Sequence, residues 1–133
     1  MTNKVSILLS TYNGEKYLNE QLESLYSQSY KNFEIIARDD GSIDNTLDIL
    51  KSYDITMVEM KNNLGAKGSF GYLLDYAIEN TYSEYFMFCD QDDIWEKDKI
   101  AKTLAKMQDM EKEYGDISLL VHTDLKVVDE DLN

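Results

Sequence analysis

The chain has 133 residues, 43% of them hydrophobic and 29% charged, a composition typical of one folded domain and unlike that of a disordered chain. Its 26 acidic residues outnumber its 13 basic ones, and the net charge of −13 disfavours nucleic acid and acidic membrane surfaces as partners. No apolar run approaches the ~20 residues that a membrane span needs, and the N-terminus lacks the pattern of a signal peptide. The single cysteine, Cys89, excludes an internal disulfide and fits a reducing cytoplasm.

The apolar pattern predicts strands and helices that alternate along the chain. Short apolar runs bounded by polar residues predict strands at residues 5–9, 33–37, 55–60, 85–89 and 117–121. Apolar residues at helical spacing predict helices at residues 15–28, 44–53 and 97–114, and a further helix that follows Ser69. Right-handed crossovers between such strands give a mostly parallel sheet with flanking helices, so the predicted fold class is α/β.

Side-chain chemistry predicts how the two middle helices begin. Asp44 and Ser69 are placed to cap the amino ends of their helices. The turn-forming residues 61–68 are expected to be a loop. In the helix after Ser69, the spacing places Ile78 on the inward, apolar face.

Polar clusters follow three of the predicted strands, at residues 10–14, 39–42 and 90–93. Parallel strands point the same way, so their carboxyl ends meet at one edge of the sheet, where open α/β sheets bind ligands. The sequence therefore predicts one site built from all three clusters.

The third cluster holds three carboxylates within four residues: Asp90, Asp92 and Asp93. Carboxylates this close repel one another unless a cation lies between them. Carboxylate oxygens together with a ligand's phosphates suit Mg²⁺ or Mn²⁺. The calcium-binding EF-hand pattern is excluded, because Ile94 and Ala101 stand where ligands should be. The alternative is that these acids cap the next helix and lie in solvent.

The first two clusters also allow two interpretations each. The carboxylate of Asp39 could accept a hydrogen bond from a ring N–H of a pyrimidine base, or it could serve only the backbone of an ordinary strand-to-helix turn. Tyr12 could stack on such a base, while the backbone around Ser10 and Thr11 positions it. The alternative for this cluster is a turn that only leads into the helix.

These residues carry a resemblance to a known family. The string STYNGEKYLNEQLESLYSQSYKNFEIIARDDGSIDNT resembles the opening of the bacterial GT-A glycosyltransferases called family 2. The string YFMFCDQDDIW resembles that family's DxD segment in the version found in rhamnosyltransferases that build surface polysaccharides, and LLVHTDLKVVDEDLN looks like the same subgroup. The resemblance covers all 133 residues. It implies that residues 1–133 are the nucleotide-sugar-binding part of a GT-A, Rossmann-like domain that is incomplete at its C-terminus.

Matched residue by residue, the resemblance implies how the chain binds a nucleoside. Ser10, Thr11 and Tyr12 would lie along the nucleoside. Asp40, or else Asp39, would pair with the base. The implied donor is a dTDP-linked sugar, with dTDP-rhamnose favoured. A UDP-linked sugar is the alternative, because thymine and uracil offer the same pairing groups.

The resemblance also implies a metal-assisted diphosphate site. Asp92 would ligate the Mg²⁺ or Mn²⁺ that bridges the diphosphate, and Asp90 would lie beside it, near the ribose. Lys67 would reach the phosphates or an acidic neighbour. In this scheme the cation also offsets the repulsion between an anionic donor and an acidic protein.

The implied reaction transfers a sugar, with inversion, to a saccharide or lipid-linked saccharide acceptor of a cell-surface polysaccharide. The general base of relatives lies well beyond the DxD segment, and no residue up to Asn133 matches it, so no catalytic residue is assigned. Donor binding is therefore the expected property of this piece. Missing C-terminal structure would leave apolar surface uncovered, which makes self-association a risk. A cytoplasmic location is expected, and attachment of the full protein to the inner face of the membrane stays open.

Other function classes fit the sequence less well. A dinucleotide-binding dehydrogenase would carry G-x-G-x-x-G after the first strand, and residues 10–14 do not supply it. A response regulator would carry paired acids after the first strand, whereas here they follow the second. The remaining rival is a catalytically inactive nucleotide- or metal-binding fragment, or an interaction scaffold.

Overall fold

The computed structural model describes residues 3–59 and 62–114, and the structural statements below concern those residues. Strands and helices alternate in the order β1 (Val5–Thr11), α1 (Glu15–Tyr26), β2 (Phe33–Asp39), α2 (Thr46–Lys51), β3 (Thr56–Val58), α3 (Gly65–Asn80), β4 (Tyr85–Cys89) and α4 (Lys99–Tyr114). The α/β alternation predicted from the sequence is confirmed. The strand predicted at residues 117–121 lies outside the described residues.

The four strands form one parallel sheet in the order β3-β2-β1-β4. The central strand is β1, in which Ile7 pairs with Ile35 of β2 on one side and with Met87 of β4 on the other. All seven residues of β1 are buried, as expected of a parallel strand that is covered on both faces. The chain runs outward from β1 to β3 and then returns to β4, so the strand order reverses between β1 and β4.

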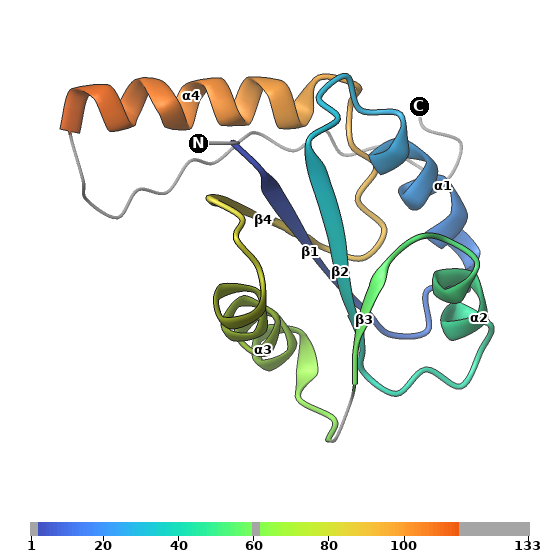
Figure 1. Ribbon diagram of the computed structural model, residues 1–133. Helices are drawn as coiled ribbons and strands as arrows, with labels where there is room; N and C mark the ends of the chain where they lie inside the picture. Colours follow the sequence, from blue (N-terminus) through green and yellow to red (C-terminus); the bar gives the residue numbers. More distant parts are fainter. Residues whose placement is uncertain (1–2, 60–61, 115–133) are drawn as a thin grey trace.

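Helices cover both faces of this sheet (Figure 1). Three of them, α1, α2 and α4, lie on one face, and α3 lies on the other. Successive residues of a strand point to opposite faces. Ile7 and Leu9 therefore pack into the larger cluster, whereas Leu8 packs with Leu73 and Ala77 of α3. The same alternation decides which face each polar residue at a strand end can reach.

The start of α3 differs from the sequence prediction. Residues 61–68 were expected to be a loop, but the helix begins at Gly65. Ser69 is not the cap of this helix: it is buried inside it, and its hydroxyl accepts hydrogen bonds from β1 and β2. The inward position predicted for Ile78 is also wrong, because this residue is 59% exposed.

The other boundaries shift by small amounts. Strands β1 and β2 each continue two residues beyond their predicted ends, because polar residues still pair in the ladder there. Helix α2 is shorter than predicted and follows Asn45, not Asp44. The carboxylate of Asp44 nevertheless accepts hydrogen bonds from the backbone N–H and the hydroxyl of Thr46, the first helical residue. Helix α1 ends two residues earlier than predicted, and α4 begins two residues later. Strand β3 begins one residue later than predicted and ends at Val58.

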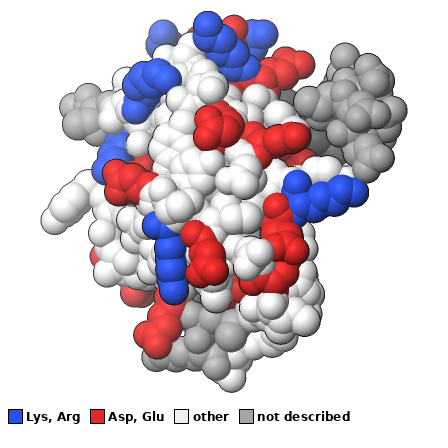
Figure 2. Space-filling view, turned by 90° about the vertical axis from the view of Figure 1, so that its right-hand side faces the viewer, with Lys and Arg blue, Asp and Glu red and all other residues white. Residues whose placement is uncertain are grey.

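The surface carries mixed charge. Figure 2 looks onto the side of the molecule formed by α1 and α2, and it shows acidic and basic side chains interspersed over the described part of that face. Within the described ranges, no helix combines the length and apolar character needed to cross a membrane.

Two apolar residues of α3 allow its orientation to be tested. Leu73→Ala should lower the free energy of unfolding by about 2–5 kcal/mol, because Leu73 is fully buried against the sheet and its loss opens a cavity. Ile78→Ala, on the same helix, should change this free energy by less than ~0.5 kcal/mol because Ile78 is exposed. Urea unfolding of both variants measures the difference. Equal losses would mean that Ile78 is buried, as the sequence pattern alone suggested.

Candidate functional site

The polar ends of β1, β2 and β4 lie side by side at the carboxyl edge of the sheet. Strand β1 pairs Leu9 with Cys89 of β4 and Thr11 with Asp39 of β2. The contact continues past the end of β2, because the Asp40 N–H donates a hydrogen bond to the Thr11 carbonyl at 2.9 Å. The three clusters are therefore brought to one edge, around the point where the strand order reverses. Ligands of open α/β sheets bind at such a point.

Asp39 is fully engaged within its own turn. Its Oδ1 accepts hydrogen bonds from the hydroxyls of Thr11 at 2.7 Å and Ser42 at 2.6 Å. Its Oδ2 accepts hydrogen bonds from the backbone N–H groups of Gly41 at 3.2 Å and Ser42 at 2.8 Å. A carboxylate has about four acceptor positions. Asp39 therefore uses its acceptor capacity to join β1 to the turn between β2 and α2.

The side chain of Asp40 lies on the other face of the sheet from that of Asp39, the face covered by α3. Its Oδ1 accepts hydrogen bonds from Nη1 of Arg38 at 2.7 Å and from the Leu64 N–H at 2.9 Å, and its Oδ2 accepts one from the Gly65 N–H at 2.9 Å. Burial by itself raises the pKa of Asp40. The hydrogen bonds from Leu64, Arg38 and Gly65, with the charge of Arg38, outweigh burial and hold the pKa below its ordinary value. Asp40 is thus an ionised carboxylate at the amino end of α3.

The side chain of Asn63 adds one more donor to Asp40. With its amide turned so that the nitrogen faces Asp40, it donates to the backbone carbonyl of Asp40, to Oδ2 at 2.8 Å and to Oδ1 at 3.2 Å. Asn63 is exposed, and this contact comes from its side chain. A bound ligand could therefore replace it without breaking the buried ion pair or moving the backbone at the start of α3.

The turn between β1 and α1 exposes Tyr12 and buries the two residues before it. The Ser10 hydroxyl donates to the Ser69 hydroxyl at 2.8 Å, on the α3 side of the sheet. The Thr11 hydroxyl donates to Asp39 on the other side. Tyr12 is 51% exposed. Of these three predicted residues, Tyr12 alone presents its side chain at the edge, where an aromatic ring can stack on a base.

Two glutamines hold the loop between β4 and α4, and sequence reasoning missed both. Oε1 of Gln91 accepts a hydrogen bond from the Tyr12 N–H at 2.5 Å, and its side chain lies against Gly14. The buried Gln21 of α1 donates from Nε2 to the Asp90 carbonyl at 2.5 Å. A glutamine on the apolar face of a helix is a signal for a buried polar contact, so Gln21 could have been found. The sequence around Gln91 offers no such signal.

The same loop concentrates negative charge. The carboxylates of Asp90 and Asp92 are exposed, and no hydrogen bond or ion pair joins either of them to another described residue. Asp92 has a φ of 72°, a left-handed conformation that few residues other than glycine adopt. Burial, followed by the charges of Asp90 and Asp92, raises the pKa of the neighbouring Asp93, although Lys99 acts in the opposite direction. The structure of the loop compensates this charge only in part.

Asp90 and Asp92 suit a hard divalent cation that is shared with a ligand. Among the described residues, no three His, Cys, Asp or Glu side chains are grouped so that they could enclose a metal ion. Mg²⁺ is usually bound by only one or two carboxylates, while water and substrate phosphates fill its other positions. Two free carboxylates on one loop meet that requirement. They fit a cation that arrives with a phosphate-bearing ligand.

Two further residues singled out in the sequence, Lys67 and Cys89, lie outside these contacts, as does Trp95 of the quoted DxD segment. Lys67 lies exposed in the first turn of α3, and no hydrogen bond or ion pair joins it to Asp90 or Asp92. Cys89 is buried, and burial raises the pKa of its thiol to about 12, so it is an inert core thiol. Trp95 is 5% exposed and belongs to the larger core cluster.

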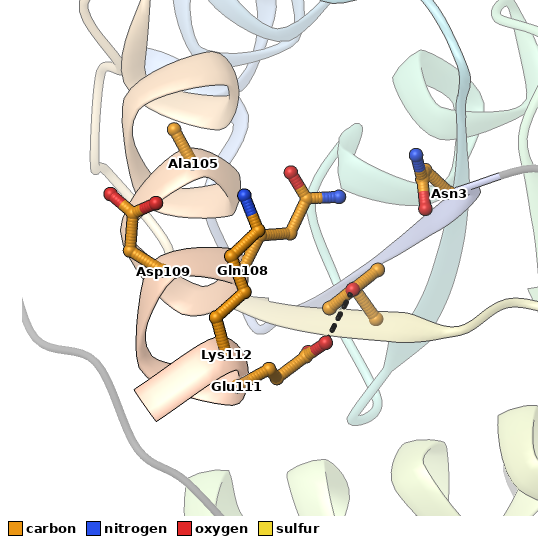
Figure 3. Close-up of a pocket in the computed structure, with 7 residues that line it drawn as sticks. Asn3, Ala105, Gln108, Asp109, Glu111 and Lys112 are labelled. Atoms are coloured by element: carbon orange, nitrogen blue, oxygen red, sulfur yellow. Dashed lines mark hydrogen bonds between the residues drawn. The ribbon is translucent and has the colours of Figure 1, made fainter. Parts of the chain in front are cut away.

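A separate hollow of about 500 Å³ lies at the amino edge of the sheet, at the other end of the strands (Figure 3). It is formed between α4 and the beginnings of β1 and β4, and its lining consists of Asn3, Tyr85, Ala105, Gln108, Asp109, Glu111 and Lys112. Within it, the Tyr85 hydroxyl donates to Oε2 of Glu111 at 3.1 Å. None of the site residues predicted from the sequence lines this hollow.

Comparison with known families decides the class of the protein. The family model for glycosyl transferase family 2 matches residues 6–119, a range that includes all three polar clusters. The chain belongs to glycosyl transferase family 2. The resemblance identified in the sequence is thereby confirmed.

Two named relatives show the range of this family. The dTDP-rhamnosyl transferase RfbG of Shigella flexneri is 36% identical over 102 residues, which cover 72% of this chain and 35% of the relative. The UDP-Glc:alpha-D-GlcNAc-diphosphoundecaprenol beta-1,3-glucosyltransferase WfaP of Escherichia coli is 38% identical over 105 residues, which cover 78% of this chain and 41% of the relative. The chain spans between 16% and 42% of the lengths of the named relatives that it matches.

Solved structures support the same fold. Residues 1–349 of S. aureus TarS, in complex with UDP, match with a TM-score of 0.67 and 30% identity, over 80% of this chain and 32% of that chain. The mannosyltransferase PcManGT from Pyrobaculum calidifontis, in complex with GDP-Man and Mn²⁺, matches with a TM-score of 0.65 and 23% identity, over 76% of this chain and 31% of that chain. The similarity to PcManGT, at 23% identity, supports the fold alone. The predicted GT-A fold is confirmed.

The contact between Gly14 and Gln91 can be tested by adding one methyl group. In Gly14→Ala, the new Cβ would lie 2.7 Å from Oε1 and 2.8 Å from Cδ of Gln91. The end of a glutamine side chain can move, so the family 2 domain should still fold. The hydrogen bond from Tyr12 should break, with a loss of about 1 kcal/mol in the free energy of unfolding. Urea unfolding and amide hydrogen exchange at Tyr12 measure the two effects.

Gly71→Ala is the control for this substitution. Gly71 lies in the interior of α3 with open space around the added Cβ. Alanine there should leave the stability unchanged or raise it by up to ~1 kcal/mol, because alanine favours helix more than glycine does. If Gly14→Ala were as stable as the wild type and left the Tyr12 amide protected, Gln91 would not hold this loop.

Proposed function

We propose that the chain is the donor-binding part of an inverting, metal-dependent glycosyltransferase that adds a sugar to a growing cell-surface polysaccharide. Membership of family 2 supplies the transferase class. The acceptor in this proposal is a saccharide or a lipid-linked saccharide. One similar protein is named for transfer to a diphosphoundecaprenol-linked sugar, and this name supports the acceptor class.

The observation that carries the proposal is the arrangement of four groups around the end of β1, of which three are exposed and the fourth, Asp40, is buried in contact with the exposed side chain of Asn63. Tyr12 at the end of β1 and Asp40 at the end of β2 lie on one side. Asp90 and Asp92 follow β4 on the other side, with their carboxylates exposed. A nucleoside diphosphate has the matching asymmetry, with an aromatic base at one end and two phosphates at the other. A ligand of this kind can use all four groups at once if a cation lies between the phosphates and the acids.

Asp40 is the better candidate than Asp39 for the base. Uracil and thymine both carry a ring N–H, which an ionised carboxylate can accept. Asp39 has no acceptor position left, whereas Asp40 is ionised and one of its donors is the replaceable side chain of Asn63. We therefore assign base pairing to Asp40, with Asp39 holding the turn beneath it.

The proposed donor is a pyrimidine nucleoside diphosphate sugar. The relative named as a dTDP-rhamnosyl transferase supports dTDP-rhamnose, which is the favoured donor. The TarS complexes with UDP and UDP-GlcNAc and the UDP-Glc-dependent relative support a UDP-linked sugar as the alternative. A carboxylate that accepts a hydrogen bond from the ring N–H does not distinguish thymine from uracil. The two kinds of donor therefore have to be distinguished by the part of the site that binds the sugar.

Each residue of the proposed site has one task. Tyr12 stacks on the base, and the backbone of Ser10 and Thr11 supports the nucleoside. Asp90 lies near the ribose, and Asp92, with Asp90 beside it, would hold Mg²⁺ or Mn²⁺.

When bound, such a cation supplies positive charge that stabilises the leaving diphosphate. Lys67, in the first turn of α3, is assigned to the phosphates. Inversion follows if the acceptor hydroxyl displaces the diphosphate directly, while a base takes up the hydroxyl proton. None of the described residues is assigned as that base.

Thermal shift with nucleotides tests the donor site. dTDP or UDP should raise the Tm of the chain in the presence of Mn²⁺, by an amount that grows with ligand excess over Kd. GDP and ADP should give no comparable shift, because adenine has no ring N–H and the ring N–H of guanine lies farther from the ribose than that of uracil or thymine. Asp92→Ala should remove the effect of Mn²⁺ on nucleotide binding.

Asp75→Ala is the matched control for Asp92→Ala, because it removes one exposed carboxylate from α3, away from the proposed site. This variant should respond to nucleotide and Mn²⁺ as the wild type does. If a folded wild-type chain showed no shift with any nucleotide, the interaction-scaffold interpretation would replace the donor site.

Base selectivity distinguishes Asp40 from Asp39. Asp40→Asn should weaken UDP binding roughly 10-fold or more, because a hydrogen bond to a charged group is lost. An amide can also donate to the ring nitrogen of cytosine, so the preference for UDP over CDP should narrow in this variant. Asp39→Asn should lower stability but keep the UDP-to-CDP ratio of the wild type. Isothermal titration calorimetry with both nucleotides gives the ratios, and a narrowed ratio in Asp39→Asn alone would reverse the assignment.

A further inference from the structure

We propose that Arg38 is a positioning residue of the donor site, which fixes the Asp40 carboxylate against the amino end of α3 and presents it to the base. This inference rests on the function proposed above and adds to it a residue outside the polar clusters that the sequence singled out.

Arg38 is a buried cation that joins three parts of the molecule. Its side chain is 1% exposed. Nη1 donates to Oδ1 of Asp40 at 2.7 Å and to the Ser69 hydroxyl at 3.1 Å, and Nη2 donates to the Asn62 carbonyl at 2.5 Å. The guanidinium also lies 5.6 Å from the ring centre of Tyr72 on α3. Strand β2, helix α3 and the segment before α3 therefore meet at this one side chain.

Stability alone gives a weak reason for this arrangement. A buried ion pair seldom stabilises a fold more than a well-packed apolar pair would, because both charges lose their hydration. Nε of Arg38 is also buried and has no hydrogen-bond partner among the described residues, which adds to the cost. This energetic cost arises at the ion pair that Arg38 forms with Asp40, the residue that the proposed function needs as an ionised hydrogen-bond acceptor. Local costs of this kind are expected at functional sites.

The geometry explains what the pair achieves. Arg38 and the Leu64 N–H both bind Oδ1 of Asp40, so this oxygen is occupied from inside the protein. Oδ2 receives the Gly65 N–H and the replaceable amide of Asn63. Holding one oxygen fixes the plane of the carboxylate and leaves the other oxygen for exchange with a ligand. Arg38 thus acts on the base through Asp40 and does not contact the base itself.

A lysine at position 38 could not replace the hydrogen bonds of the arginine. The planar guanidinium directs separate N–H groups to Asp40, Ser69 and Asn62 at once, whereas a lysine ammonium is a single point of charge on a flexible stem. Arg38→Lys should keep the charge and the fold but loosen the carboxylate. Arg38→Met should remove both the charge and the hydrogen bonds.

The test is a double-mutant cycle on the chain, read by calorimetry with three probes: UDP, CDP, and pyrophosphate with Mn²⁺. Arg38→Met should weaken UDP binding at least 10-fold and narrow the UDP-to-CDP ratio, while Arg38→Lys should lie between this variant and the wild type. Binding of pyrophosphate with Mn²⁺ should stay within about twofold, because Asp90 and Asp92 follow β4 and are untouched. A purely structural role would weaken the nucleotide and pyrophosphate probes alike.

The cycle also asks whether Arg38 works through Asp40. In an Asp40→Asn background, Arg38→Met should have little further effect on UDP binding, because the group it positions is already gone. This double variant removes both buried charges, so it should fold even if Arg38→Met does not. Full additivity of the two losses would overturn the proposal.

Failure of this inference and failure of the proposed function give different results. A wild-type chain that binds UDP, together with an Arg38→Met variant of unchanged affinity and selectivity, would overturn the role of Arg38 alone. A folded wild-type chain that binds no nucleotide would overturn both.

Discussion

Two neighbouring carboxylates at the end of β2 hold the polar edge of this sheet together. Backbone alternation turns their side chains to opposite faces of the sheet. Asp39 binds Thr11 and the turn that leads into α2, and Asp40 binds Arg38 and the amino end of α3. Each helical layer is therefore tied to the same strand end by one carboxylate. The position of Tyr12 follows, because β1 is fixed to β2 through the last pair of this ladder.

The carboxylates at the polar edge differ in how many hydrogen bonds they accept from the rest of the protein. Asp39 and Asp40 are buried, and each accepts several hydrogen bonds from within the fold. The carboxylates of Asp90 and Asp92 are exposed and accept no hydrogen bond from the described residues. The negative charges of Asp39 and Asp40 are stabilised by hydrogen bonds within the fold, whereas a bound cation would be needed to offset the repulsion between Asp90 and Asp92. In the proposed site, this division would give a base a fixed hydrogen-bond acceptor and a metal ion two exposed carboxylates.

The fold could be predicted from the sequence to a large extent. The errors of this prediction have a common physical cause. Apolar runs and helical spacing report burial, so the alternation of elements and the parallel sheet followed from them. Ser69 matched the local pattern of a helix cap but lies inside α3, because the first N–H groups of this helix are capped by Asp40, 24 and 25 residues earlier in the chain. Ile78 matched the apolar face, yet α3 is the one described helix on its side of the sheet, and this residue is exposed there.

The sequence by itself determined the family, the three polar clusters and their meeting at one edge, since parallel strands carry their carboxyl ends to the same side. Only the tertiary structure decided which of these groups remain available. It commits Asp39 and the hydroxyls of Ser10 and Thr11 to contacts within the fold, and leaves Tyr12, Asp90 and Asp92 accessible. It also brings in Arg38 and Gln91, whose roles arise from partners far along the chain. A hydrogen bond between residues distant in sequence leaves no periodic trace in either segment, so no local pattern could have revealed it.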